Sequence, residues 1–259
     1  MYQTCPKCGA TAAAGAPADR CAVCGVIYAK WLRAQLGRAN ASTTSHGPAP
    51  GAADDEDDGF FARLWDNAVY VEQDADPWII GGRGAVWFGL LIWTFWFFGT
   101  DYKEVFGGFP EMNTSFMHTI NLVFHEAGHI IFILLGEFMG VLGGSLAQLM
   151  MPAAVVVAFL VYQNPFGSSV GLWWLGQSAM DLAPYIADAR AGQVILLGGV
   201  TGNERPGFHD WEVILSWLGW MQHDHAIAGV VDGLGRFTMV AALVWGGWLV
   251  YKQFHLRAR

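Results

Sequence analysis

The chain has 259 residues, of which 54% are hydrophobic and only 14% charged, and its formal net charge at pH 7 is -8. An ordinary soluble domain carries about 25% charged residues, so the composition excludes a wholly soluble protein and predicts a membrane protein. The 13 Trp and 33 Gly residues are typical of spans with aromatic anchors and closely packed helices. No part of the chain is basic enough to predict a nucleic-acid partner.

All four cysteines lie near the N-terminus, in two CxxC pairs that are separated by twelve residues: Cys5 with Cys8, and Cys21 with Cys24. Four thiolates at this spacing suit a closed tetrahedral zinc site, and a disulfide pair is the alternative. The pattern predicts a small zinc ribbon over residues 1–37, with one structural Zn²⁺. Reduced thiolates would place it in the cytoplasm, where we expect it to bind a cytosolic protein.

A linker is predicted over residues 38–59, because Ala, Ser, Thr, Gly and Pro dominate it and five acidic residues follow at 54–58. Such a segment cannot bury enough apolar surface to order itself, so we expect a flexible acidic tether. The remaining residues, 60–259, are predicted to form a multi-span membrane domain. It opens with a short amphipathic helix over residues 60–71, which we expect to lie on the bilayer surface.

Four apolar stretches are predicted to cross the bilayer, at residues 84–99, 114–138, 141–162 and 227–251. A fifth, residues 168–190, reads either as a span or as a helix broken at Pro184. The fold class is therefore mainly α, a polytopic helical membrane domain with a small four-cysteine zinc ribbon. The compact architecture suits a bacterial inner membrane.

The positive charges set a constraint on this topology. Lys252, Arg257 and Arg259 follow the last span, which predicts a cytoplasmic C-terminus on the same side as the ribbon. Both ends in the cytoplasm require an even number of crossings. Since five apolar segments are present, one of them should not cross.

The segment at residues 114–138 contains the HExxH pattern of His125, Glu126 and His129. Residues four apart share one face of a helix, so the two imidazoles can bind one Zn²⁺, with Glu126 beside them as a general base for a bound water. The alternative is a buried helix whose polar groups satisfy one another. Ionisable groups inside a membrane segment are costly and mark functional sites, so we interpret this segment as a catalytic zinc site.

A catalytic zinc ion of this kind needs a third protein ligand. The residues leave several candidates open: Asp181 and Asp188, which are seven residues apart, the pair His209 and Asp210, and a cluster at residues 223–225. Gln148 lies in another apolar stretch, where its amide must find a partner, and we expect it to contact substrate or to support a metal ligand.

The FHEAGH sequence, followed downstream by Asp181-Leu-Ala-Pro184-Tyr-Ile-Ala-Asp188-Ala, resembles the site-2 protease family of intramembrane zinc metalloproteases. That family carries HExxH in one span and NxxPxxxxDG in a later one. Here Pro184 matches, Asp181 stands in place of the Asn, and Asp188 falls one residue short of the family's aspartate. The resemblance implies that Asp188 is the third ligand and that Asp181 orients substrate or a metal ligand. Asp181 and His209 remain the alternatives for the third ligand.

The resemblance implies an intramembrane zinc metalloprotease that hydrolyses peptide bonds of membrane-protein substrates, with Glu126 as general base. It would hold one catalytic and one structural Zn²⁺. Two other functions are compatible with the residues: a non-proteolytic membrane zinc-binding protein, and a membrane-anchored scaffold whose ribbon binds a cytosolic partner.

Overall fold

A computed structural model describes residues 4–5, 7–8, 10–11, 21–24, 26–28, 59–72 and 75–257. The chain divides into two compact units, Met1–Glu56 and Asp57–Arg259. In the first, the described residues hold the four cysteines and a bridge between Thr4 and Thr11. Apart from Gly59, the linker predicted over residues 38–59 lies outside the described residues, as does Arg259.

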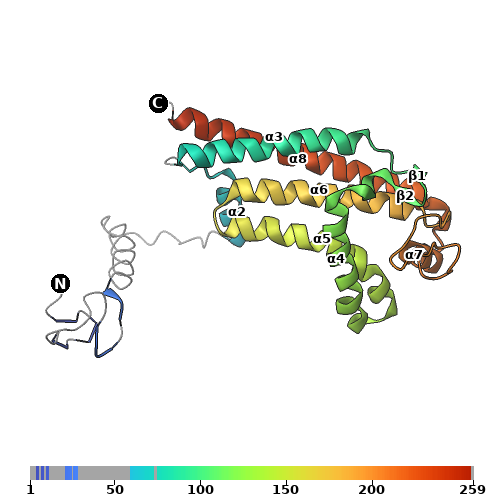
Figure 1. Cartoon of the computed structure of the whole chain (residues 1–259), viewed down its shortest axis with the longest axis horizontal. Helices are drawn as coiled ribbons and strands as arrows, with labels where there is room; N and C mark the ends of the chain where they lie inside the picture. Colours follow the sequence, from blue (N-terminus) through green and yellow to red (C-terminus); the bar gives the residue numbers. More distant parts are fainter. Residues whose placement is uncertain are drawn as a thin grey trace, which may run out of the picture. The chain divides into compact units, whose positions relative to one another are not determined.

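The second unit is mainly helical, as predicted (Figure 1). Its long elements are α2 (Phe60–Val69), α3 (Pro77–Gly99), α4 (Phe116–Phe132), α5 (Glu137–Val161), α6 (Pro165–Ala187), α7 (Asp210–Leu218) and α8 (Asp224–Arg257). Two-residue strands, β1 (Val105–Phe106) and β2 (Phe109–Pro110), form an antiparallel hairpin. Single 3₁₀ turns complete it: η1 (Glu111–Thr114), η2 (Ile133–Leu135) and η3 (Met221–His223).

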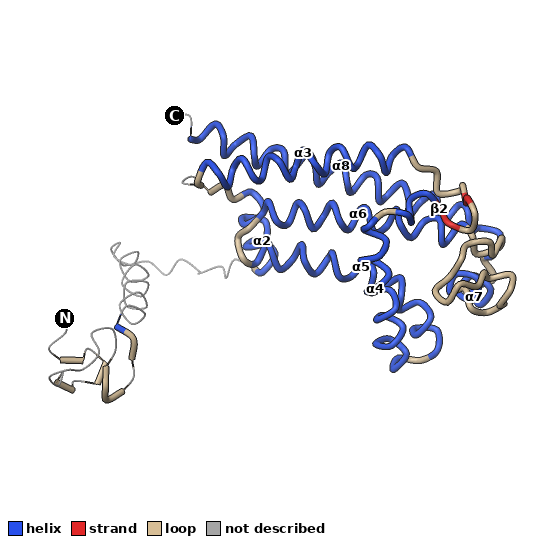
Figure 2. Tube along the Cα trace, viewed as in Figure 1, coloured by secondary structure: helices blue, strands red, loops and turns tan. Residues whose placement is uncertain are grey.

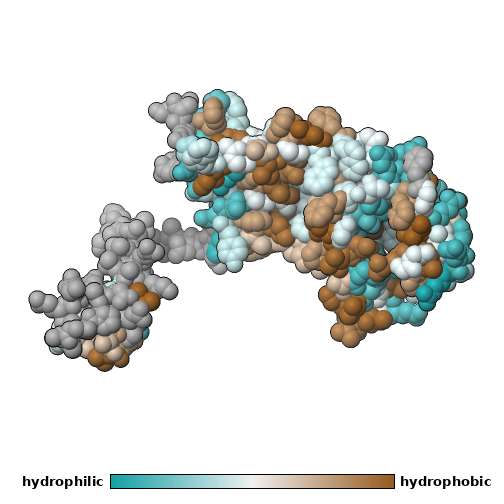
Figure 3. All heavy atoms as spheres, in the orientation of Figure 1, coloured by the Kyte–Doolittle hydropathy of each residue, from teal (hydrophilic) through white to brown (hydrophobic). Residues whose placement is uncertain are grey.

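Within the described residues, four helical segments are long and apolar enough to cross a membrane: Pro77–Gly99, Phe116–Leu135, Glu137–Val161 and Met221–Leu256. They coincide with the four predicted spans. Many large apolar side chains on them are exposed, and Figure 3 shows apolar residues over much of the visible surface of the bundle. Such a surface suits a lipid environment.

The ambiguous segment forms a single helix, α6, which Pro184 does not break. Asn164 caps its start by accepting a hydrogen bond from the Gly167 amide at 3.0 Å, and Pro165 occupies the first turn, where a missing N–H costs nothing. Pro184 lies in the last turn, so only one backbone hydrogen bond is lost near the helix end. Most of α6 is buried, which makes it the central helix of the unit.

Helices α6 and α8 touch through bare backbone. A Cβ added at Gly176 would lie 2.7 Å from the carbonyl oxygen of Gly235, and one added at Gly235 would lie 2.6 Å from that of Gly176. Small residues at matched positions allow helices to approach this closely. Beside this contact, Phe97, Trp173, Met180 and Met239 form part of the apolar core.

The helix that carries the HExxH pattern runs in a different direction from the others. In Figures 1 and 2, α3, α6 and α8 lie alongside one another, whereas α4 and the start of α5 form a hairpin at a steep angle to them. The turn of this hairpin lies at Gly136, whose φ of 107° favours glycine. Farther along α5, Pro152 removes a backbone hydrogen bond, a usual cause of helix bending.

Candidate metal centres

Two histidines of α4 and one aspartate of α7 lie close together. His125 and His129 lie one turn apart on α4, and Asp210 is the first residue of α7. One carboxylate oxygen, Oδ2 of Asp210, lies 3.0 Å from Nε2 of His125 and 3.2 Å from Nε2 of His129. Ligand atoms bound tetrahedrally to zinc at about 2.0–2.1 Å lie roughly 3.3 Å from one another. The three side chains therefore have the spacing of a metal-ligand set.

The other nitrogen of each imidazole is held by an oxygen. His125 Nδ1 lies 3.0 Å from Oε1 of Gln148, and His129 Nδ1 lies 2.8 Å from the carbonyl oxygen of Gly140. Because these oxygens only accept hydrogen bonds, both Nδ1 atoms must carry the proton, and a neutral imidazole then has a lone pair at Nε2. Two lone pairs facing a carboxylate oxygen would repel it. A second proton on the imidazoles or a cation between them removes the conflict, and this arrangement of ligand and supporting oxygen is usual for metal-bound histidine.

Space for an ion is preserved by a glycine on α5. A Cβ added at Gly144 would lie 2.6 Å from Nε2 of His125 and 2.6 Å from Nε2 of His129. Any larger residue would occupy the place where a metal would bind. The donor set, the tautomers and this gap fit a divalent ion such as Zn²⁺.

The surroundings of Asp210 favour its ionised form. Burial raises the pKa of this carboxyl, but in the metal-free site protonated His125 and His129 donate hydrogen bonds to it, which outweigh the burial and lower the pKa to about 2. The group is therefore an anion at neutral pH, which is the form that binds a metal.

Asp188 does not reach the two histidines, contrary to the assignment that the resemblance implied. Helix α6 ends at Ala187, and the Asp188 carboxylate accepts hydrogen bonds from the backbone amides of Gln193 and Val194, each at 2.9 Å. Its Oδ2 also lies 3.6 Å from Nε2 of His209. Asp188 thus anchors the chain that leads to Asp210, and it is Asp210 that lies beside the two histidines as a candidate third ligand.

The two alternative ligands, Asp181 and His209, also lie away from the imidazole Nε2 atoms. His209 is completely buried and caps α7, with Nδ1 accepting from the amide of Glu212 at 3.3 Å. This cap fixes the start of the helix that carries Asp210. The sequence brought Asp210 into consideration beside His209, but nothing in the local pattern favoured one over the other.

Asp181 belongs to a polar network behind the metal ligands. It accepts hydrogen bonds from Asn121 at 3.1 Å and from Nε2 of Gln148 at 3.3 Å, and it pairs with Nδ1 of His118 at 3.0 Å. Gln148 in turn holds His125. Asp181 is thereby linked to His125 through Gln148, and its orienting role stays a prediction. The Gln148 amide is engaged at both ends and holds His125, which is the arrangement expected of a residue that supports a metal ligand; contact with substrate stays a prediction.

A cavity of about 670 Å³ opens beside this group. Its wall includes His125, Glu126 and His129 from α4, Tyr185 from α6 and the loop residues Val194–Gly198. Among the described residues, none forms a hydrogen bond or ion pair with the Glu126 carboxylate. Glu126 is therefore available to a molecule in the cavity.

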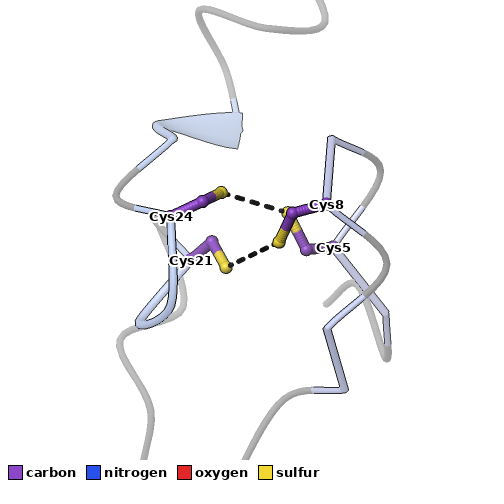
Figure 4. Close-up of side chains that lie close together, drawn as sticks. All are labelled: Cys5, Cys8, Cys21 and Cys24. Carbon is purple, nitrogen blue, oxygen red and sulfur yellow. Dashed lines mark hydrogen bonds between the residues drawn. The ribbon is translucent and has the colours of Figure 1, made fainter.

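The N-terminal unit contains a second candidate centre, formed by the four cysteines (Figure 4). Sγ of Cys5 lies 3.7 Å from Sγ of Cys24, and Sγ of Cys8 lies 3.8 Å from Sγ of Cys21. A disulfide requires about 2.05 Å, whereas sulfurs bound tetrahedrally at about 2.3 Å to zinc lie roughly 3.8 Å apart. The four thiols are free and have the spacing of a zinc site with four cysteine ligands, as predicted.

The thiols of the cysteine cluster differ in their pKa values. The amides of Cys24 and Val23 lower the pKa of Cys21 to about 6. The amide of Ala10 lowers that of Cys8, but the neighbouring thiols of Cys24 and Cys5 raise it to about 12. Four thiolates this close together would repel one another, and a bound cation would balance their charge.

No family model, no curated protein and no solved structure matches this chain.

Proposed function

We propose that this protein is a zinc-dependent membrane endopeptidase of the site-2 protease kind, which cleaves segments of other membrane proteins. The observation that carries the proposal is the placement of an unpaired carboxylate, Glu126, in a cavity beside His125, His129 and Asp210. A metal site used only for storage or structure has little need for such a carboxylate. The apolar helices around the cavity favour a substrate from the bilayer.

Zn²⁺ bound by His125, His129 and Asp210 would supply Lewis-acid polarisation and make water acidic near neutral pH. Glu126 takes a proton from the water while the water oxygen bonds to the peptide carbonyl carbon. The same carboxyl then passes that proton to the leaving nitrogen as the C–N bond breaks. Gln148 and the Gly140 carbonyl keep the imidazoles in the required orientation throughout.

The cysteine unit would hold a structural zinc ion and offer a cytosolic protein-binding module. Its four thiolates would fill every position of a tetrahedral ion, so the site leaves no open position for substrate. We therefore assign hydrolysis to the membrane unit alone.

The proposal is tested with the Glu126→Gln variant of the full chain in detergent, with β-casein and a single-span test protein as substrates. Glu126→Gln should retain two zinc ions per chain and lose roughly 10²–10⁴-fold in turnover, the usual contribution of a general base. His125→Ala should retain one zinc ion. Equal turnover by wild type and Glu126→Gln would contradict the role of Glu126. A wild-type protein with two zinc ions and no turnover would favour a non-proteolytic zinc protein.

A further inference from the structure

Peptide hydrolysis places negative charge on the carbonyl oxygen, and enzymes stabilise it with a hydrogen-bond donor aimed at that oxygen. The cavity wall offers few uncommitted donors near the metal ligands. Gln148 donates to Ser178 and Asp181, and His118 pairs with Asp181 two helical turns from His125. Asn113 also lines the cavity, but the hydroxyl of Tyr185 is the donor that a hydrogen bond places directly beside Asp210.

Tyr185 is held rigidly. Its ring packs against His209, tilted by 30° with centroids 4.2 Å apart, and forms an edge contact with His125 at 5.8 Å. These contacts come from two separate places in the chain, the start of α7 and the middle of α4, so the ring has little freedom to rotate away from the cavity. A fixed donor needs no reorganisation when charge develops.

The hydrogen bonding of Tyr185 leaves its proton available. The phenolic oxygen accepts a hydrogen bond from the backbone amide of Asp210 at 3.0 Å. Since that lone pair is used, the O–H must point elsewhere. At rest the nearby acceptor is the Asp210 carboxylate, which interacts with the hydroxyl, but that carboxylate already faces two imidazoles. A developing oxyanion in the cavity would be the stronger acceptor.

We propose that Tyr185 is a catalytic residue that donates its hydroxyl hydrogen bond to the carbonyl oxygen of the peptide under attack. This inference rests on the proposed endopeptidase function. As the water oxygen bonds to carbon, Glu126 takes the water proton and the C=O electron pair moves onto oxygen, where Tyr185 O–H stabilises it. The pair then reforms C=O as the C–N bond breaks, and the proton goes from Glu126 to nitrogen. Tyr185 keeps its own proton.

The test is Tyr185→Phe in the full chain, with Tyr162→Phe as the matched control, because Tyr162 is 81% exposed at the end of α5. Tyr185→Phe should lower kcat on β-casein by roughly 10²–10³-fold, the loss found when one oxyanion donor is removed. KM should change by less than about twofold, because the hydrogen bond strengthens only in the transition state. The control should match wild type.

Two further measurements separate this role from mere support of Asp210. Zinc content should stay at two ions per chain, and affinity for a peptidyl phosphinate, a tetrahedral analogue, should fall about 100-fold, in line with the loss of one oxyanion donor. Loss of zinc in Tyr185→Phe would make Tyr185 a positioning residue and overturn the proposal, as would an unchanged kcat. No turnover by wild type would instead overturn the endopeptidase function, and the role of Tyr185 with it.

Discussion

The proposed metal site on α4 depends on the position of one carboxylate. Asp210 places a single oxygen within hydrogen-bonding distance of two imidazole nitrogens, and it does so from the first turn of a separate helix. Both carboxylate oxygens of Asp188 accept hydrogen bonds from backbone amides in the loop between α6 and α7. The two aspartates therefore have separable roles, one toward the metal and one toward the loop.

Substitution distinguishes these roles. Asp210→Ala should remove one of two zinc ions per chain, because two histidines alone make a poor zinc site. Asp188→Asn should keep both ions but destabilise the protein by about 1–3 kcal/mol, since an amide group replaces an acceptor that satisfies buried N–H groups. Zinc analysis and thermal unfolding in detergent measure the two effects. Zinc loss in Asp188→Asn, with retention in Asp210→Ala, would restore Asp188 as the ligand.

At the residue scale, the sequence could predict only groups whose members lie close together along the chain. His125, Glu126 and His129 follow from a spacing of four residues, and the four cysteines follow from two CxxC pairs. Asp210 and Tyr185 come from other helices, and their approach to α4 depends on long-range packing that no local pattern encodes. The resemblance favoured Asp188 because it assigns residues by their position in a sequence motif, without regard to how the chain folds. In this protein α6 ends at Ala187, so Asp188 lies just beyond the helix and binds backbone amides of the following loop.

Among the helices, α6 is the most deeply buried, although its sequence was the hardest to interpret. Gln177, Ser178 and Asp181 lower its hydropathy, yet all three are buried inside the unit. Hydropathy identifies helices that face lipid, so α3, α4, α5 and α8 were predictable from it. A helix surrounded by protein can carry polar residues on every side if they find partners.

The close contact between α6 and α8 can be tested with two glycines of α8. Gly235→Ala places a Cβ 2.6 Å from the Gly176 carbonyl oxygen and 2.8 Å from the Met180 side chain, so overpacking should cost about 1–3 kcal/mol. Gly233 lies two residues earlier with no atom within 4 Å of an added Cβ. Gly233→Ala should be neutral or up to about 1 kcal/mol stabilising, from helix propensity.

Unfolding in mixed detergent micelles, followed by circular dichroism, measures both changes. The comparison is matched, because the two variants add the same methyl group to the same helix. Equal stability of the two variants would mean that the α6–α8 backbones are not in contact.

For the membrane unit as a whole, the direction of the helices leads us to expect that α4, although long and apolar enough to cross, is the one of the five apolar segments that does not span the bilayer. Following the colours of Figure 1, α3, the later part of α5, α6 and α8 run alternately toward and away from the end that carries β1, β2 and α7. Helix α4 crosses this bundle at a steep angle and adds no full passage along it. Four passages bring α2 and the C-terminal end of α8 to the same end of the unit.

We expect this end to face the cytoplasm, because Lys252 lies there and basic residues favour that side. The loop that contains Glu204, near α7 and the metal site, should then lie outside. In bacterial cells, green fluorescent protein fused to either terminus should fluoresce, and an epitope inserted after Glu204 should be labelled in intact spheroplasts. If α4 crosses the bilayer on its own, five passages separate the termini and only one of the two fusions fluoresces. If neither fusion fluoresces and the epitope is protected, the orientation is inverted, and the cysteine unit would face an oxidising compartment in which disulfides could replace zinc.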